Sequence, residues 1–295
     1  MSPDKSIVET LSKASPDRLI ICADDYGISP AASAGIRQLA AAGRLSATGV
    51  MTCMPAWPCE AGALSELADR LSVGLHFTLT DQRPLGDMPE LAPDGRLPPI
   101  GTLLHRSLSG RLAADEVAAE LNRQLDAFET YIGRPPDFLD GHQHVHLLPG
   151  IMPAVLGAFG RRLNRRRCWL RDCTDRPWAL WRRGSAGKAM FIAYLGRALA
   201  RAAREMGIAT NRGFSGFYDA RQHAVGDVFE HMLIGAGDGH LLMMHPGHVD
   251  ADLEACDSLT GPRETEWQFL IADGLPQRLA ARGLVIAGPG VPAGR

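Results

Sequence analysis

The chain has 295 residues, of which 45% are hydrophobic, the composition of a globular protein with a full core. Its formal net charge is −2, which argues against a general nucleic-acid binder. No apolar run approaches the ~18 residues of a membrane span, and the first residues lack the apolar core of a signal peptide. A chain of this length can form one large domain, and we expect a lead-in segment over 1–16 and one domain over 17–290.

The cysteines indicate a reducing compartment. No two of them have the Cys-x-x-Cys spacing of a redox or zinc motif, and one lies within an apolar run. The cysteines are Cys22, Cys53, Cys59, Cys168, Cys173 and Cys256. We therefore expect free thiols, several of them in the core, in a cytoplasmic protein.

Strand-like and helical patterns alternate through the first third of the chain. The expected elements are a strand at 18–23, a helix at 30–42, a strand at 46–52, a helix at 57–70 and a strand at 71–80. Pro30 opens the first helix and Gly43 stops it. The first strand runs into Asp24-Asp25-Tyr26-Gly27, and the third contains His76.

Residues 81–100 carry five prolines and no periodic pattern, which predicts a long loop. Such loops in enzymes are lids, binding loops or plain connectors. We expect a mobile cover over the site, with a connector as the alternative.

The same alternation continues to the end of the chain. The expected elements are helices at 113–131 and 151–161, a strand at 165–172, a helix at 227–234, a strand at 240–245, a helix at 262–282 and a strand at 283–287. The helix at 113–131 has an apolar face formed by Val117, Leu121, Leu125 and Phe128. Alternating strands and helices predict an α/β fold with mostly parallel strands.

The segment 178–206 mixes tryptophans and arginines with an Ala/Leu-rich helical pattern. This composition is typical of a membrane-surface helix. More often, such a composition belongs to a solvated helix whose arginines extend to water. The wider segment 161–206 contains no catalytic motif, so its role stays open.

Three histidines alternate in Asp140-Gly-His-Gln-His-Val-His146. If this run continues a strand, His142, His144 and His146 share a face and can reach one metal ion, and their spacing does not separate them. Asp140 adds an oxygen ligand or a hydrogen-bond partner for a ligand. The alternative is a polar loop whose histidines only cap and hydrogen-bond.

Acidic residues and histidines gather at or near the ends of the predicted strands. They are Asp24, Asp25, His76, Asp140, His142, His144, His146, His245 and His248. One carboxylate and two imidazoles can hold a metal ion with a coordination position left open, and the remaining groups can move protons. Singly, an Asp pair is more often a helix cap and a lone histidine a core residue. Together these residues indicate a metal-dependent hydrolase with its site at the C-terminal ends of the strands.

Four segments resemble the YdjC/ChbG family of carbohydrate deacetylases. They are Ala23-Asp-Asp-Tyr-Gly27, Gly74-Leu-His-Phe-Thr-Leu79, Leu139-Asp-Gly-His-Gln-His-Val-His-Leu147 and Met244-His-Pro-Gly247. The segment 257–266 also looks like this family. The resemblance implies a distorted, TIM-barrel-like (β/α) barrel that hydrolyses the N-acetyl group of an amino sugar, such as a chito-oligosaccharide or a related glycoconjugate. It also implies one divalent metal ion, Mg²⁺ or Zn²⁺, and a homodimer.

The resemblance also implies roles for the residues at the positions that match the family's functional residues. The metal ligands are Asp25, His76 and His142; the base is Asp24 and the acid His245; residues near the substrate or the ligands are Tyr26, Asp140, His144 and His146. In this mechanism the metal activates a water, Asp24 takes its proton, and His245 or His144 protonates the leaving amine. Neighbouring strand residues face opposite ways, so the strand has to bend, which Tyr26-Gly27 permits.

Two other classes of protein remain open. A metal-dependent phosphoesterase also uses Asp/His clusters, but it would want two metals ~3.5–4 Å apart and basic groups for phosphate. A non-catalytic metal-containing binding protein would close its site with four protein ligands, often cysteines, and no cysteine lies near the histidine motifs.

Overall fold

The computed structural model describes residues 15–183, 186–217 and 224–292. Most of the predicted lead-in, residues 1–14, lies outside the described residues. The cysteines are free thiols, as predicted, and Cys22, Cys168 and Cys173 are buried.

The described residues form an 8-stranded parallel sheet. Its strands are β1 Asp17–Tyr26, β2 Ala47–Val50, β3 Ser72–Phe77, β4 Phe138–Gly141, β5 Trp169–Leu170, β6 Phe214–Ser215, β7 Leu241–Met244 and β8 Leu284–Ile286. The order is β5-β4-β3-β2-β1-β7-β6, and β8 pairs with the start of β1. A parallel bridge from Leu170 to Thr210 joins β5 to the segment before β6. The two outer edges therefore meet, and the fold is a distorted (β/α) barrel, as predicted.

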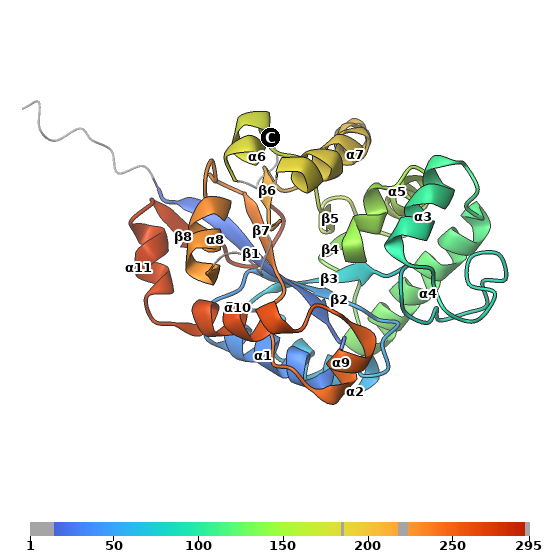
Figure 1. Ribbon diagram of the computed structural model, residues 1–295, viewed down its shortest axis with the longest axis horizontal. Helices are drawn as coiled ribbons and strands as arrows, with labels where there is room; N and C mark the ends of the chain where they lie inside the picture. The colour runs from blue at the N-terminus through green and yellow to red at the C-terminus, as the bar shows by residue number, and fades with distance from the viewer. Residues whose placement is uncertain (1–14, 184–185, 218–223, 293–295) are drawn as a thin grey trace, which may run out of the picture.

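The helices surround this sheet (Figure 1). They are α1 Pro30–Ala41, α2 Trp57–Ser65, α3 Ile100–Leu108, α4 Ala114–Ile132, α5 Met152–Arg161, α6 Pro177–Arg182, α7 Ala186–Glu205, α8 Val225–Met232, α9 Ala251–Cys256, α10 Gly261–Ile271 and α11 Leu275–Ala280. The sequence patterns had not predicted the short elements α3, α9 and β6. Among the described residues, no helix is long and apolar enough to cross a membrane.

Local chemistry explains where α1 begins and where α4 ends. Ser29 caps α1, because its hydroxyl accepts a hydrogen bond from the Ala32 N–H at 3.2 Å. Helix α4 ends at Gly133, which has a left-handed φ of 78°. The apolar face predicted for α4 is buried, and α4 contacts β3, which confirms that helix.

Several predicted elements are shorter or broken; the helix predicted at 57–70, for example, ends at Ser65. The strand predicted at 165–172 is only the two-residue β5. The single helix predicted at 262–282 is wrong, because α10 ends at Ile271 and α11 begins at Leu275. Ala272 is extended with ψ 141°, and Pro276, which has no N–H to donate, stands at the start of α11.

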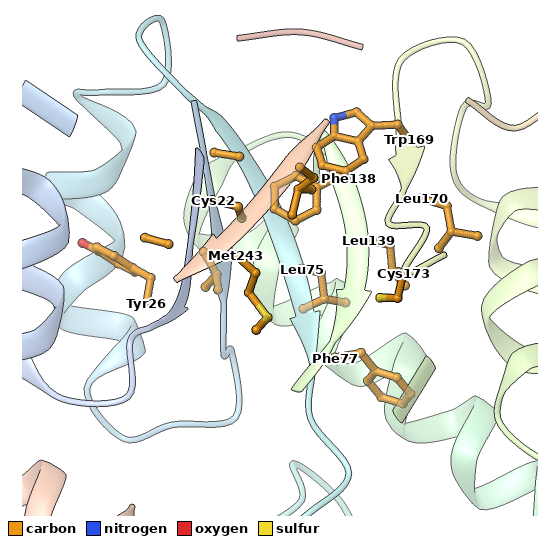
Figure 2. Close-up of a cluster of buried hydrophobic side chains, with 14 of the residues drawn as sticks. Cys22, Tyr26, Leu75, Phe77, Phe138, Leu139, Trp169, Leu170, Cys173 and Met243 are labelled. Atoms are coloured by element: carbon orange, nitrogen blue, oxygen red, sulfur yellow. The ribbon is translucent and has the colours of Figure 1, made fainter. Parts of the chain in front are cut away.

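Aromatic side chains fill the interior near β3, β4 and β5 (Figure 2). The rings of Phe138 and Trp169 stack with centroids 4.4 Å apart, and both residues are almost fully buried. Gly74 on β3 faces Phe138 so closely that an added Cβ would lie 2.5 Å from ring carbons. The packing of β4 on β3 therefore requires glycine at this position.

We predict that Gly74→Ala destabilises the fold by ~1–3 kcal/mol, the usual cost of overpacking a core. Urea unfolding measures this difference. Gly62→Ala is the matched control, because Gly62 lies within α2 and its added Cβ meets nothing within 4 Å. That control should be neutral or stabilising by up to ~1 kcal/mol. Equal stability of the two variants would contradict the packing described for β3 and β4.

Candidate active site

A cavity of about 770 Å³ lies at the C-terminal ends of the strands. Most of the predicted site residues line this cavity. Apolar residues of α7 and residues 257–259 of the loop before α10 complete its wall. The predicted residues in its wall are Asp24, Asp25, His76, His142, His144 and His245. The barrel therefore brings together side chains more than 200 residues apart in sequence, as a strand-end site requires.

A bend in β1 lets both aspartates enter this site. The register between β1 and β2 shifts between Ala23 and Tyr26, and Asp25 has a left-handed φ of 68°. Aspartate is among the few residues that tolerate this conformation. We predicted the bend at Tyr26-Gly27, but Asp25 itself makes it, and Gly27, with φ 90°, follows. Both carboxylates are consequently buried, each with 1% of its residue surface exposed.

Asp25 lies between two imidazoles. Its Oδ1 is 3.4 Å from Nε2 of His76 and 3.0 Å from Nδ1 of His142. One ligand atom from each of these three residues lies within 4.8 Å of the other two, a spacing that can hold one metal ion. The other carboxylate oxygen, Oδ2, accepts a 2.7 Å hydrogen bond from the buried Arg263. Arg263 thus fixes which oxygen of Asp25 faces the histidines.

Asp140 orients His76 from behind. Its Oδ1 is 2.6 Å from Nδ1 of His76, which leaves Nε2 directed at Asp25. Burial lowers the pKa of His76, but Asp140 and Asp24 outweigh burial and raise this pKa to about 10. The same negative charge that favours a proton on this ring favours a metal cation in its place, and metal binding would release that proton.

A second group, formed by Asp24, His76 and Asp140, also has metal-ligand spacing. A buried guanidinium already occupies it: Arg171 contacts both oxygens of Asp24 at 2.6 Å and Oδ2 of Asp140 at 2.5 Å. A metal ion there would meet this positive charge. The geometry therefore favours the group that contains Asp25.

The balance of buried charge fits a cation as well. Three buried aspartates (Asp24, Asp25 and Asp140) face two buried arginines (Arg171 and Arg263). Three negative charges less two positive charges leave one negative charge, which the proton held by His76 balances. A divalent ion on Asp25 and the two histidines would replace that proton, so the donor set and the charge both fit a metal ion.

The histidine run does not continue the strand. Strand β4 ends at Gly141, and residues 142–147 form a 3₁₀ turn (η1, His142–Leu147) in which Gln143 and His144 have left-handed φ values of 51° and 62°. The predicted common face of the three histidines is therefore wrong. Only His142 turns toward Asp25.

The other two histidines of the turn, His144 and His146, pack against other protein groups and not against Asp25. His144 contacts the edges of Phe214 and Phe217, with ring centroids 5.7 and 5.0 Å away. Nε2 of His146 lies 3.3 Å from the backbone carbonyl of Arg171. Burial lowers the pKa of His144 well below its usual range and that of His146 to about 4. Both rings are neutral at neutral pH and are poor proton donors.

His245 follows β7 on the other side of the cavity. Its backbone N–H donates a 2.6 Å hydrogen bond to the carboxylate of Glu266, which is buried in the cavity wall. His245 also lowers the pKa of Asp24, although Arg171 and His76 do so more strongly. Asp24 and His245 therefore line the same cavity, and they follow different strands of the sheet.

Two predicted site residues lie elsewhere. The Tyr26 hydroxyl donates to the Glu60 carbonyl and accepts from Arg37, both at 2.8 Å, and Figure 2 shows its ring directed away from Met243 in the cavity wall. His248 packs on Trp267 with ring centroids 4.5 Å apart and is not among the residues that line the cavity.

The proline-rich loop packs on helix α4. The Glu116 carboxylate on α4 accepts hydrogen bonds from the backbone N–H groups of Glu90 and Leu91, both at 2.9 Å. Met88, Leu91 and Leu97 are buried. Of the predicted segment 81–100, Ile100, which begins α3, lines the cavity, whereas the loop before it packs on α4. The mobile cover stays a prediction.

The sequence analysis considered acidic residues and histidines, and it therefore missed two arginines of the site, Arg171 and Arg263. Arg171 has a signal of its own, because it directly follows β5 and so occupies the same strand-end position as the catalytic candidates. Arg263 lies within 257–266, which the resemblance had marked. Nothing in either segment indicates that the guanidinium is fully buried.

Comparisons with known proteins show the family of the chain. The family model described as "YdjC-like protein" matches residues 18–281. The chain is 41% identical over 138 residues to a chitooligosaccharide deacetylase of Serratia marcescens, covering 46% of this chain and 53% of that protein. It is 35% identical over 160 residues to a carbohydrate deacetylase of Mus musculus, covering 50% of each. The chain thus spans about half the length of the curated relatives it matches.

A solved structure shares the fold. It is a crystal structure from Enterococcus faecalis V583, provisionally described as a cellobiose-phosphate cleavage protein, with a TM-score of 0.70 and 20% identity over 93% of this chain and 98% of that one. This likeness concerns the fold alone. Since the family model covers most of the chain, from strand β1 to the end of α11, the protein belongs to the YdjC-like family.

Proposed function

We propose that this protein is a metal-dependent carbohydrate N-deacetylase, a hydrolase that removes the acetyl group from an N-acetylated amino sugar. The activities named for the curated relatives support a chito-oligosaccharide or a related glycoconjugate as substrate. The observation that carries the proposal is the separation of two adjacent aspartates. Asp25 faces two histidines, whereas Asp24 is held by Arg171 and shares the cavity with His245.

Asp25, His76 and His142 would hold the metal ion. Two imidazole nitrogens and one carboxylate oxygen suit Zn²⁺ and also accept Mg²⁺ and other divalent ions. When bound, such an ion lowers the pKa of a water and polarises the acetyl carbonyl. The chain's own contribution is the orientation of the ligands, through Asp140 behind His76 and Arg263 behind Asp25.

Asp24 is the proposed general base. Burial raises its pKa, but Arg171 and His76 outweigh burial, so its pKa lies below the usual range and the carboxylate is ionised. The two guanidinium hydrogen bonds fix its orientation in the wall of the cavity. From there Asp24 can take a proton from a water that attacks the acetyl carbon.

His245 is the proposed general acid that protonates the leaving amine. His144 was the alternative, but its ring packs against Phe214 and Phe217, and burial lowers its pKa well below the usual range, which disfavours the imidazolium form that donates a proton. His245 lines the cavity on a different strand from Asp24, so base and acid can reach opposite sides of one amide.

The competing classes fit less well. A two-metal phosphoesterase would need a second ion beside the first, and Arg171 occupies the neighbouring donor group. A closed structural metal site would have four protein ligands, whereas the Asp25 group has three and borders an open cavity. The homodimer and the cytoplasmic location stay predictions.

The first test concerns the ligands. Replacing Asp25, His76 or His142 by Ala should empty the metal site and abolish acetate release from N-acetylated sugars. Metal content by elemental analysis and acetate by coupled assay measure both effects. His248→Ala is a matched control, because this histidine lies outside the cavity and the variant should keep metal and activity. A fully loaded, active ligand variant would contradict the assignment.

The second test concerns Asp24. Asp24→Asn should keep the metal but lose ~10²–10⁴-fold in turnover, the usual contribution of a general base. His245→Ala should behave in the same way, because it removes the proton donor and not a ligand. If Asp24 only held Arg171 in place, the amide oxygen of its Asn variant could still accept from the guanidinium and the variant would stay active. An active variant, or one without metal, would show that the roles of the two aspartates are wrong.

A further inference from the structure

Helices α6 and α7 expose large apolar side chains to solvent. They lie together beyond one rim of the barrel (Figure 1), and they contact one another. Their exposed large hydrophobic residues are Trp178, Trp181, Met190, Phe191 and Tyr194. Trp181 is 74% exposed and Tyr194 is 66% exposed. With the exposed basic residues Arg182, Arg197, Arg201 and Arg204, these residues form what we call the α6–α7 face.

Helix α7 presents this face by its periodicity. Met190, Tyr194, Arg197 and Arg201 are spaced i, i+4, i+7 and i+11, so they follow one another along one side. The opposite side is buried, through Ala189, Ile192, Ala193 and Leu199. The outer side is therefore apolar in the N-terminal half of the helix and basic in the C-terminal half.

The charge of this region opposes that of the whole chain. Residues 176–205 contain seven basic residues and one acidic residue, whereas the protein has a net charge of −2. Extended arginines of a solvated helix account for the basic residues of this region, but they do not account for the outward side chains of Trp181 on α6 and Tyr194 on α7. A second copy seated on the same face would bring like charges together across a two-fold axis. An anionic lipid surface complements both the positive charge and the aromatic rings.

We propose that the α6–α7 face docks on the surface of an anionic lipid bilayer. Trp181 and Tyr194 would enter the headgroup region, and Arg197 and Arg201 would contact lipid phosphates. Lys188 and Phe191 on α7 are exposed and also line the catalytic cavity. The docked face therefore borders the mouth of the cavity. This proposal concerns binding to a surface and does not depend on the reaction that the cavity performs.

The test uses the full chain and vesicles of phosphatidylcholine, with or without phosphatidylglycerol. Co-sedimentation should show binding only to the anionic vesicles, and added salt should weaken it. The double variant Arg197→Gln, Arg201→Gln should bind the anionic vesicles with a partition coefficient about 25-fold lower. Each lost positive charge contributes a factor of ~5. Trp181→Ser with Tyr194→Ser should also reduce it, and circular dichroism would verify that these surface variants fold.

Matched controls lie elsewhere on the surface. Leu108→Ser removes another exposed apolar side chain, 59% exposed on α3, and Arg111→Gln removes another exposed arginine. Neither should change vesicle binding. Equal binding to both kinds of vesicle, equal losses in the controls, or a dimer in light scattering that only the α6–α7 variants disrupt would each overturn the proposal. Release of acetate from a soluble sugar should be unchanged in all these variants, so the outcome is independent of the proposed activity.

Discussion

The contact on which the site depends is the buried guanidinium of Arg171 between the carboxylates of Asp24 and Asp140. It joins the ends of β5, β1 and β4, three strands that do not all neighbour one another in the sheet. The backbone carbonyl of Arg171 also lies 3.3 Å from Nε2 of His146 in the η1 turn. Removing one partner of such a buried pair leaves an uncompensated charge, at a cost of ~3–5 kcal/mol. The same buried ion pairs, from Arg171 to Asp24 and Asp140, therefore stabilise both the site and the end of the barrel.

Two arginines give two adjacent aspartates different surroundings. Arg171 engages both oxygens of Asp24, whereas Arg263 engages only Oδ2 of Asp25 and leaves Oδ1 to the histidines. The left-handed φ of Asp25 makes this possible, because an unbent strand would direct the two side chains to opposite faces. Arg263 also contacts Asp257 at 2.6 Å, so the same cation connects Asp25 to the loop in the cavity wall.

Local patterns predicted the fold well because alternating strands and helices repeat along the whole chain. They also placed Asp24, Asp25, His76 and His245 at strand ends, where a parallel barrel collects its polar groups. They could not show the η1 turn, since its left-handed residues carry no sequence signature as clear as glycine. Nor could they show the contact between Arg171 and Asp24, which are 147 residues apart and meet only when the barrel closes.

The central claim is that the metal ion binds to Asp25, His76 and His142, while Arg171 keeps it away from Asp24 and Asp140. Anomalous diffraction from crystals soaked in Zn²⁺ tests this most directly. The account predicts one peak ~2.0–2.2 Å from Asp25 Oδ1, His76 Nε2 and a ring nitrogen of His142, with Arg171 still on Asp24. A peak between Asp24, His76 and Asp140, with Arg171 displaced, would contradict it.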